Sequence, residues 1–175
     1  MKRNIGILFI LPVVALVLVA CGSAKTSNAL TTEELQDAEY QTQWTPEGVV
    51  RLENGEYRAP AAPGSASEIV VALTEHLVVG ELNGESAAAV ILNSSGGGSG
   101  TFYELHIVVE RDGQPHDIAW TQLGDRVQIN SLAIEENEIM VDMVTQGPDD
   151  PMCCPTQHVV QTYALQGETL VQTSE

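Results

Sequence analysis

Residues 102–121 read FYELHIVVERDGQPHDIAWT, and this stretch decides the fold class. Apolar side chains recur in it at every second position, at Tyr103, Leu105, Ile107 and Val109. A period of two places such side chains on one face of a β-strand. Asp112-Gly113 then separates Phe102–Val109 from a second apolar run, Ile118–Thr121. Because Asp-Gly supplies the positive φ that two-residue hairpins need, the stretch predicts an antiparallel β-hairpin.

The same combination of turn dipeptides and apolar, β-branched runs continues from Gly48 to the end of the chain. Further turns are predicted at Asn54-Gly55, Asn83-Gly84, Gln166-Gly167 and within Glu135–Glu138. The runs that they separate include Val49–Leu52 and Tyr57–Ala59, Leu77–Val79 and Ala87–Leu92, and Val159–Leu165 and Thr169–Gln172. About nine strands closely spaced by turns predict a mainly β protein, with a single antiparallel meander, sandwich-like or barrel-like domain.

Two irregularities interrupt this pattern. Val127 and Ile129 alternate in one phase, whereas Leu132 and Ile134 continue in the opposite phase, which predicts a β-bulge near Asn130-Ser131. The segment 93–101, NSSGGGSGT, is so rich in glycine that it predicts a loop, which needs contacts with the rest of the protein to hold one shape.

A short helix is predicted before the first strand. Thr31-Thr32-Glu33-Glu34 matches a capping box, in which Thr31 caps the helix and Glu34 reaches back to it. The helix is expected over about residues 32–40, with Leu35 and Ala38 on one side, and packed on an edge or end of the β domain. Trp44-Thr45-Pro46 ends it, because the residue before a proline avoids the helical conformation.

The charge balance is strongly acidic. The chain has 7 Lys and Arg against 24 Asp and Glu, which gives a net charge of −17. Nucleic-acid binding needs clustered basic side chains that neutralise phosphates, so no nucleic acid is expected as a partner.

The N-terminus has the organisation of an export signal. Lys2 and Arg3 precede an uncharged, apolar run, Ile5–Ala20, which is shorter than the roughly 20 residues that span a bilayer. Leu18-Val19-Ala20-Cys21 resembles the lipobox of bacterial lipoproteins. The resemblance implies cleavage before Cys21 and attachment of a diacylglyceryl group to its thiol, usually with a further acyl chain such as palmitate on the new amine. Two or more acyl chains anchor a protein stably in a membrane.

These features predict the domain organisation and the location. Residues 1–20 are expected to be the signal peptide, 21–30 the lipidated Cys21 with a flexible tether, and 31–175 a single mainly-β extracytoplasmic domain. Membrane lipid is then a partner through the acylated Cys21. The expected location is the cell membrane or the outer membrane, at the extracytoplasmic face.

A series of short motifs covers most of the chain after Cys21, at residues 35–40, 50–57, 80–85 and 97–102, with LGDRV at 123–127 and GPDDPMCCPT at 147–156. In this combination they resemble a group of exported bacterial β-rich proteins, many of them lipoproteins. The resemblance implies a location outside the cytoplasm and a single domain, and it implies no activity.

One motif has the spacing of a calcium loop. Glu81, Asn83 and Glu85 stand at relative positions one, three and five of an oxygen-ligand loop. However, Ser86 replaces the glycine that permits the sharp turn, and Leu92 stands where a bidentate glutamate belongs. An Asn-Gly hairpin with solvated acids is therefore the favoured interpretation, with calcium as the alternative.

Cys153 and Cys154 would be the only free thiols once Cys21 is lipidated, in an oxidising compartment. The Cα atoms of adjacent residues lie about 3.8 Å apart, below the usual 4.4–6.8 Å of a disulfide. Three interpretations remain: a vicinal disulfide that rigidifies the Pro148–Pro155 loop, a soft-metal site for an ion such as Cu(I) with Met152 and His158 as further ligands, and a redox switch. The structural disulfide is favoured.

No catalytic residue and no cofactor is expected. Serines of the Gly-rich loop, among them Ser94, lack the Gly-x-Ser-x-Gly context of a hydrolase nucleophile. His106 lies within a predicted strand, where a satisfied or exposed histidine is the default, and acids such as Asp117 are expected to be solvated.

These expectations lead to a function class. The protein is predicted to be a non-catalytic binding or structural module of the cell envelope, whose partner is an envelope protein or ligand that the sequence does not identify. The alternative is a redox or soft-metal-binding protein centred on the Cys153-Cys154 loop.

Overall fold

The computed structural model of the protein describes residues 29–174. Over these residues the fold is mainly β, with antiparallel sheets and one short helix, as the alternation and the turns predicted. The predicted signal peptide, Cys21 and most of the predicted tether lie outside the described residues. Leu30, assigned to the tether, is only 5% exposed and packs in a core, so the folded part includes it.

The larger sheet has five antiparallel strands in chain order. They are β3 (Glu56–Pro60), β4 (Glu68–Leu82), β5 (Glu85–Ser95), β6 (Phe102–Arg111) and β7 (Gln114–Asp125). Asn83-Gly84 joins β4 to β5 and Asp112-Gly113 joins β6 to β7, and all four residues have positive φ. Both predicted hairpins are thus confirmed.

The smaller sheet has four antiparallel strands in the order β11-β10-β9-β8. They are β8 (Gln128–Glu135), β9 (Glu138–Thr145), β10 (Gln157–Gln166) and β11 (Thr169–Ser174). The pairing of β8 with β9 shifts register between Ile129 and Ser131, which confirms the predicted bulge. The shift lets Ile129 and Leu132 pack against the same core despite their opposite phases.

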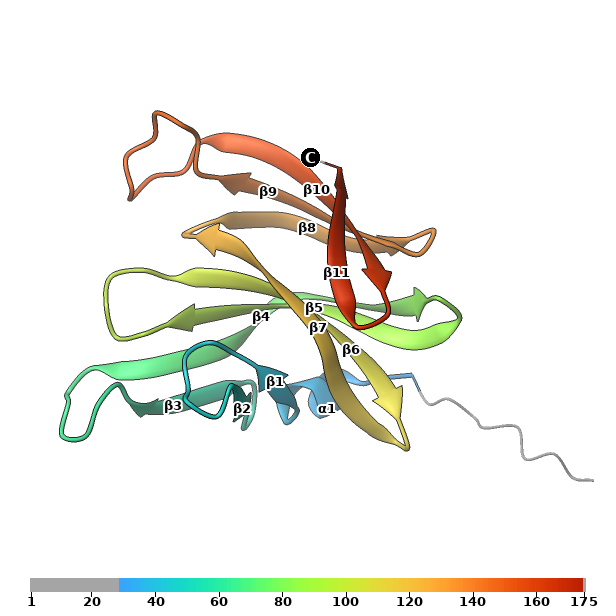
Figure 1. Cartoon of the computed structure of the whole chain (residues 1–175), viewed down its shortest axis with the longest axis horizontal. Helices are drawn as coiled ribbons and strands as arrows, with labels where there is room; N and C mark the ends of the chain where they lie inside the picture. Colours follow the sequence, from blue (N-terminus) through green and yellow to red (C-terminus); the bar gives the residue numbers. More distant parts are fainter. Residues whose placement is uncertain (1–28, 175) are drawn as a thin grey trace, which may run out of the picture.

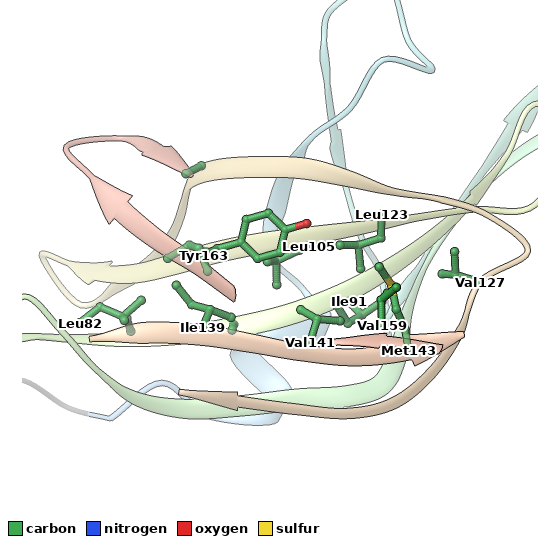
Figure 2. Packing of buried hydrophobic residues seen from close by; sticks show 14 of the residues in the cluster. Leu82, Ile91, Leu105, Leu123, Val127, Ile139, Val141, Met143, Val159 and Tyr163 are labelled. Carbon is green, nitrogen blue, oxygen red and sulfur yellow. The ribbon is translucent and has the colours of Figure 1, made fainter. Parts of the chain in front are cut away.

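The two sheets enclose the main hydrophobic core. Figure 2 shows Ile91 and Leu105 of the larger sheet gathered with Ile139, Val141 and Met143 of the smaller sheet. At one edge β4 lies against β8, where a Cβ on Gly80 would meet the Ile134 Cβ at 3.4 Å. At the other edge β7 contacts β11, so the sandwich is partly closed like a barrel.

The other face of the larger sheet is covered by residues 30–52, here called the N-terminal cover. It contains α1 (Thr32–Gln36), β1 (Glu39–Gln41) and β2 (Val49–Arg51). A second core forms between the cover and the sheet, from Leu30, Leu35, Ala38, Tyr40, Val50 and Leu52 on the cover and Val71, Ala88, Val90, Leu92 and Val108 on the sheet. Leu35 of α1 packs in this second core, and α1 also contacts β7, the edge strand of the larger sheet, where an edge or end position was expected.

The predicted helix is correct at its start and too long at its end. The capping box forms, since the Thr31 side chain accepts from Glu34 N and the Glu34 side chain accepts from Thr31 N. The helix ends at Gln36, because Tyr40, which was expected within the helix, belongs to β1. There its hydroxyl donates to the Leu35 carbonyl at 2.9 Å and its backbone pairs with β2.

The hairpin predicted at Asn54-Gly55 is wrong in its pairing. Both residues have positive φ and form a turn, but β2 pairs with β1, and β3 pairs with β4. A single bridge, Glu53 to Glu56, crosses the turn. Burial of the cover against the sheet outweighs the local preference for a longer hairpin.

Within residues 29–174, no helix is both long and apolar enough to cross a membrane.

Candidate functional site

The antiparallel order of the strands sorts their connections to two ends of the sandwich. The turn end carries the two-residue connections 83–84, 112–113, 136–137 and 167–168, and the loop end carries the connections 61–67, 96–101, 126–127 and 146–156. In Figure 1 the β3–β4, β5–β6 and β9–β10 loops gather at the left, and the β4–β5 and β8–β9 turns lie at the right. The loop end is therefore the irregular end of a rigid scaffold, where binding groups are commonly carried.

Arg126 joins two loops of the loop end that come from different sheets. Its guanidinium donates to the Ser99 carbonyl in the β5–β6 loop and to the Met152 carbonyl, at 3.2 Å, in the β9–β10 loop. Asp125 forms an ion pair with the same guanidinium. The side chain of Arg126 is only 25% exposed, so these contacts are partly shielded from water.

The Gly-rich β5–β6 loop receives the contacts that its composition requires. Asp125 Oδ1 accepts from Thr101 N at 2.8 Å, and Arg126 N donates to the Thr101 carbonyl at 2.7 Å. The Trp44 ring fills the space beside Gly96, where a Cβ would lie 2.5 Å from it. These contacts hold the loop in one place.

The β9–β10 loop is organised around Asp150. Its carboxylate accepts from Gly147 N at 2.8 Å and from Thr156 N and Oγ1, each at 2.7 Å. The hydrogen bond from Gly147 N, followed by the bond from the Thr156 hydroxyl, lowers the pKa of Asp150. The loop thus closes on its own carboxylate.

At the tip of this loop the structure places a disulfide between Cys153 and Cys154, whose Cα atoms lie 3.8 Å apart. Met152 beside it is 78% exposed. His158, the further ligand of the soft-metal interpretation, lies on β10, where its Nε2 is 2.8 Å from Asp142 Oδ1. The Asp142 carboxylate therefore already occupies this imidazole nitrogen.

The residues of the calcium alternative lie at the turn end. Glu81 and Glu85 are exposed and flank the Asn83-Gly84 turn. Asn83 is used in packing, because its backbone N donates to Asn137 Oδ1 at 2.8 Å and its Nδ2 donates to the Leu165 carbonyl at 3.1 Å. Across the described part of the chain, no three His, Cys, Asp or Glu side chains gather as a metal-binding group.

A second group of polar side chains is buried beneath the N-terminal cover. His106 Nδ1 lies 2.9 Å from Asp117 Oδ2, and its Nε2 lies 3.8 Å from Glu104 Oε2. Ser94 Oγ donates to the same Glu104 oxygen at 3.0 Å. The side chains of Glu104 and His106 are fully buried, and that of Asp117 is 2% exposed. The expectation that Asp117 is solvated is therefore wrong.

Aromatic rings complete the surroundings of His106. Trp120 stacks on the imidazole at a centroid distance of 5.8 Å, and Tyr40 meets it edge-on at 5.5 Å. Burial is the largest influence on the pKa of His106 and lowers it, but the hydrogen bond with Asp117 and the charges of Asp117 and Glu104 together raise it above its ordinary value. Burial, and then the charge of Asp117, raise the pKa of Tyr40.

The cluster contains the residue types of a hydrolase triad without their arrangement. Ser94 lies within β5 and is only 1% exposed, and its hydroxyl forms a hydrogen bond with Glu104 and not with His106. A nucleophile must be within reach of both its base and the substrate. A signal for this cluster was present in the sequence, since Glu104 and His106 alternate with the apolar face of the quoted strand.

Comparison of the chain with protein-family models, curated proteins and solved structures finds no match.

Proposed function

We propose that the protein is a membrane-anchored extracytoplasmic lipoprotein, and that its loop end is the binding face of a non-catalytic module of the cell envelope. The observation that carries the proposal is the junction at Arg126, which ties the β5–β6 loop to the β9–β10 loop. A surface whose loops are already ordered loses less conformational entropy when it binds.

The chemistry of the loop end suits a protein or ligand with an apolar contact surface. Met152 projects from the tip, and Cys153 and Cys154 are also exposed. Thioether side chains adapt to irregular partners and recur on binding surfaces. Segments 97–102, 123–127 and 147–156, all part of the resemblance to exported lipoproteins, meet at this end.

Lipid anchorage is proposed from Cys21 and the apolar run before it. Without Lys2 and Arg3, which leave with the signal peptide, the net charge would be −19, so anionic headgroups would repel the β domain and it would stand away from the bilayer. Labelling of cells with a palmitate analogue tests this. Wild-type chain should carry the label and sediment with membranes, and Cys21→Ala should lose both properties. Unlabelled, uncut wild-type chain in the cytosol would contradict the proposal.

The binding face is tested by photo-crosslinking in intact cells. A photoreactive residue at Met152 should give a discrete adduct, whereas the same residue at Glu135, exposed beside the turn end, should give none. Equal yields from both positions, or none from Met152, would contradict the assignment of the loop end.

A redox role for the Cys153-Cys154 loop is the second candidate. It is favoured by one observation, the exposure of both cysteines, which leaves the disulfide open to external thiols. Alkylation and mass spectrometry of the protein taken directly from cells distinguish a redox role from a structural disulfide. A uniformly bridged pair supports a structural disulfide, and free thiols in part of the population support the redox role.

A further inference from the structure

We propose that Glu104, His106 and Asp117 form a proton-operated latch that fastens the N-terminal cover to the larger sheet. The latch lies in the interior of the protein, away from the disulfide loop, and it is independent of the binding role proposed for the loop end.

The cover is attached to the cluster through Asp117. The carboxylate oxygen that faces His106, Oδ2, also accepts from the backbone N of Gln41 at 2.8 Å. The Gln41 side chain in turn donates to the Asp117 carbonyl at 3.2 Å. Tyr40 packs on His106 and bonds to Leu35, so β1 and α1 are both linked to the cluster.

The geometry around His106 fits the imidazolium form. One carboxylate stands at each ring nitrogen, Asp117 at Nδ1 and Glu104 near Nε2. Only the Nδ1 contact is a hydrogen bond, and Glu104 acts on Nε2 through its charge at 3.8 Å. A charged imidazole suits an acid on each side, whereas a neutral one turns a lone pair toward one of the two acids. Deprotonation would therefore leave two buried carboxylates beside a ring that no longer balances them.

No other cation compensates this charge within the described residues. The arginines there are engaged elsewhere: Arg51 with the Asp37 carbonyl, Arg58 with Glu56 and Glu68, Arg111 with Glu168, and Arg126 with Asp125. Glu104 Oε1, Asp117 Oδ1 and His106 Nε2 are buried without a hydrogen-bond partner. Among the described residues, the charge of a protonated His106 is thus the positive charge that lies beside both acids.

A small opening lies where the cover meets the sheet. A cavity of about 130 Å³ is lined by Glu39, Tyr40, Gln41, Val49, His116 and Asp117. It lies at the β1–β7 junction, beside Asp117. The titratable groups in contact with His106 are Glu104 on β6, Asp117 on β7 and Tyr40 on β1, and Glu39 and His116 line the cavity beside Asp117.

The direction of the pH response follows from the raised pKa of His106. Its stabilising effect is complete below the ordinary histidine pKa of about 6.5 and is lost as the pH rises through the higher folded value. The cover should therefore loosen on the alkaline side, while the sandwich beneath it stays folded.

Hydrogen–deuterium exchange of the full chain tests the latch between about pH 6 and pH 9, with rates corrected for intrinsic exchange. Peptides from residues 37–52 should lose protection as the pH rises, by up to about tenfold for each unit by which the pKa is raised. Peptides from β9 and β10 should not change. His158→Gln, which removes the exposed pair with Asp142, is the matched control and should behave like wild type.

Two variants complete the test. His106→Gln should leave the cover loose at every pH. Asp117→Asn keeps an oxygen for Gln41 and should move the midpoint of the response to lower pH. Constant protection of residues 37–52 in the wild type would overturn the latch. Simultaneous loss of protection in β9 and β10 would also overturn it, because the pH effect would then be on global stability.

Discussion

The turn end and the loop end of the sandwich are built by different kinds of interaction. At the turn end, two-residue connections reverse the chain locally, with positive φ at residues such as Asn83, Asp112 and Asn137. At the loop end, Arg126 and Trp44 fix segments that are distant in sequence. The regular end therefore depends mainly on backbone conformation, whereas the proposed binding end depends on a few side chains.

The largest difference is expected between two glycines, Gly97 at the loop end and Gly113 at the turn end. Both have positive φ, +84° and +79°. A Cβ at Gly97 would lie 2.8 Å from the Ser67 Cβ and 3.1 Å from the Glu68 carbonyl oxygen, whereas at Gly113 it meets nothing within 4 Å. Gly97→Ala should lower the free energy of unfolding by about 2–4 kcal/mol, and Gly113→Ala by about 1 kcal/mol.

Urea denaturation of both glycine variants measures this difference. Equal losses of stability would show that the β5–β6 loop is no more tightly packed than a free turn.

Two arginines provide the next comparison. Arg126→Ala removes bonds to two loops from a side chain that is 25% exposed, and we expect a loss of about 2 kcal/mol. Arg111→Ala removes an exposed pair with Glu168 at the turn end, and we expect less than about 0.5 kcal/mol. Unfolding midpoints of the two variants at equal salt check this order, and a larger loss for Arg111→Ala would reverse the comparison.

At the turn end, two substitutions of Asn137 distinguish the effect of its backbone conformation from the effect of its hydrogen bond. Its φ is +66° and its Oδ1 accepts from Asn83 N. Asn137→Ala loses both advantages and should cost about 1–2 kcal/mol, whereas Asn137→Gly keeps the conformation and should cost about 0.5–1 kcal/mol. Thermal unfolding distinguishes them, and an alanine variant as stable as the glycine variant would show that positive φ is unimportant there.

The smallest global effect is expected for Asp150→Asn. This substitution weakens the bonds from Gly147 and Thr156 that lower the pKa of Asp150. The unfolding midpoint should stay unchanged, while amide exchange at both residues becomes faster. In the wild type, the same local loosening should appear only as the pH falls through the lowered pKa of Asp150, because protonation removes the charge that these bonds stabilise.

If Asp150→Asn raised the unfolding midpoint, or left amide exchange at Gly147 and Thr156 unchanged, the role of this carboxylate in ordering the loop would be contradicted.

The same contrast explains what the sequence could predict. Turns such as Asp112-Gly113 and the bulge before Ser131 are determined by residues adjacent in the sequence, so both were predictable. The end of the helix at Gln36 was not, because Tyr40 is placed by burial against a distant sheet. The β5–β6 loop was recognised, but its attachment to Arg126 depends on tertiary packing.

The candidate sites show the same limit. The Cys153-Cys154 disulfide could be predicted because the two cysteines are adjacent in the sequence. The buried cluster was missed because His106 and Asp117 come together only through the register of β6 and β7, which contains a shift between Ile107 and Val108.

The most direct test of the preformed loop end is hydrogen–deuterium exchange of Arg126→Ala, with Arg111→Ala as the control. We predict faster exchange in residues 96–101 and 147–156 together, and no change at the 83–84 and 136–137 turns. Faster exchange in only one of the two loops, or in neither, would contradict the claim that they form one surface.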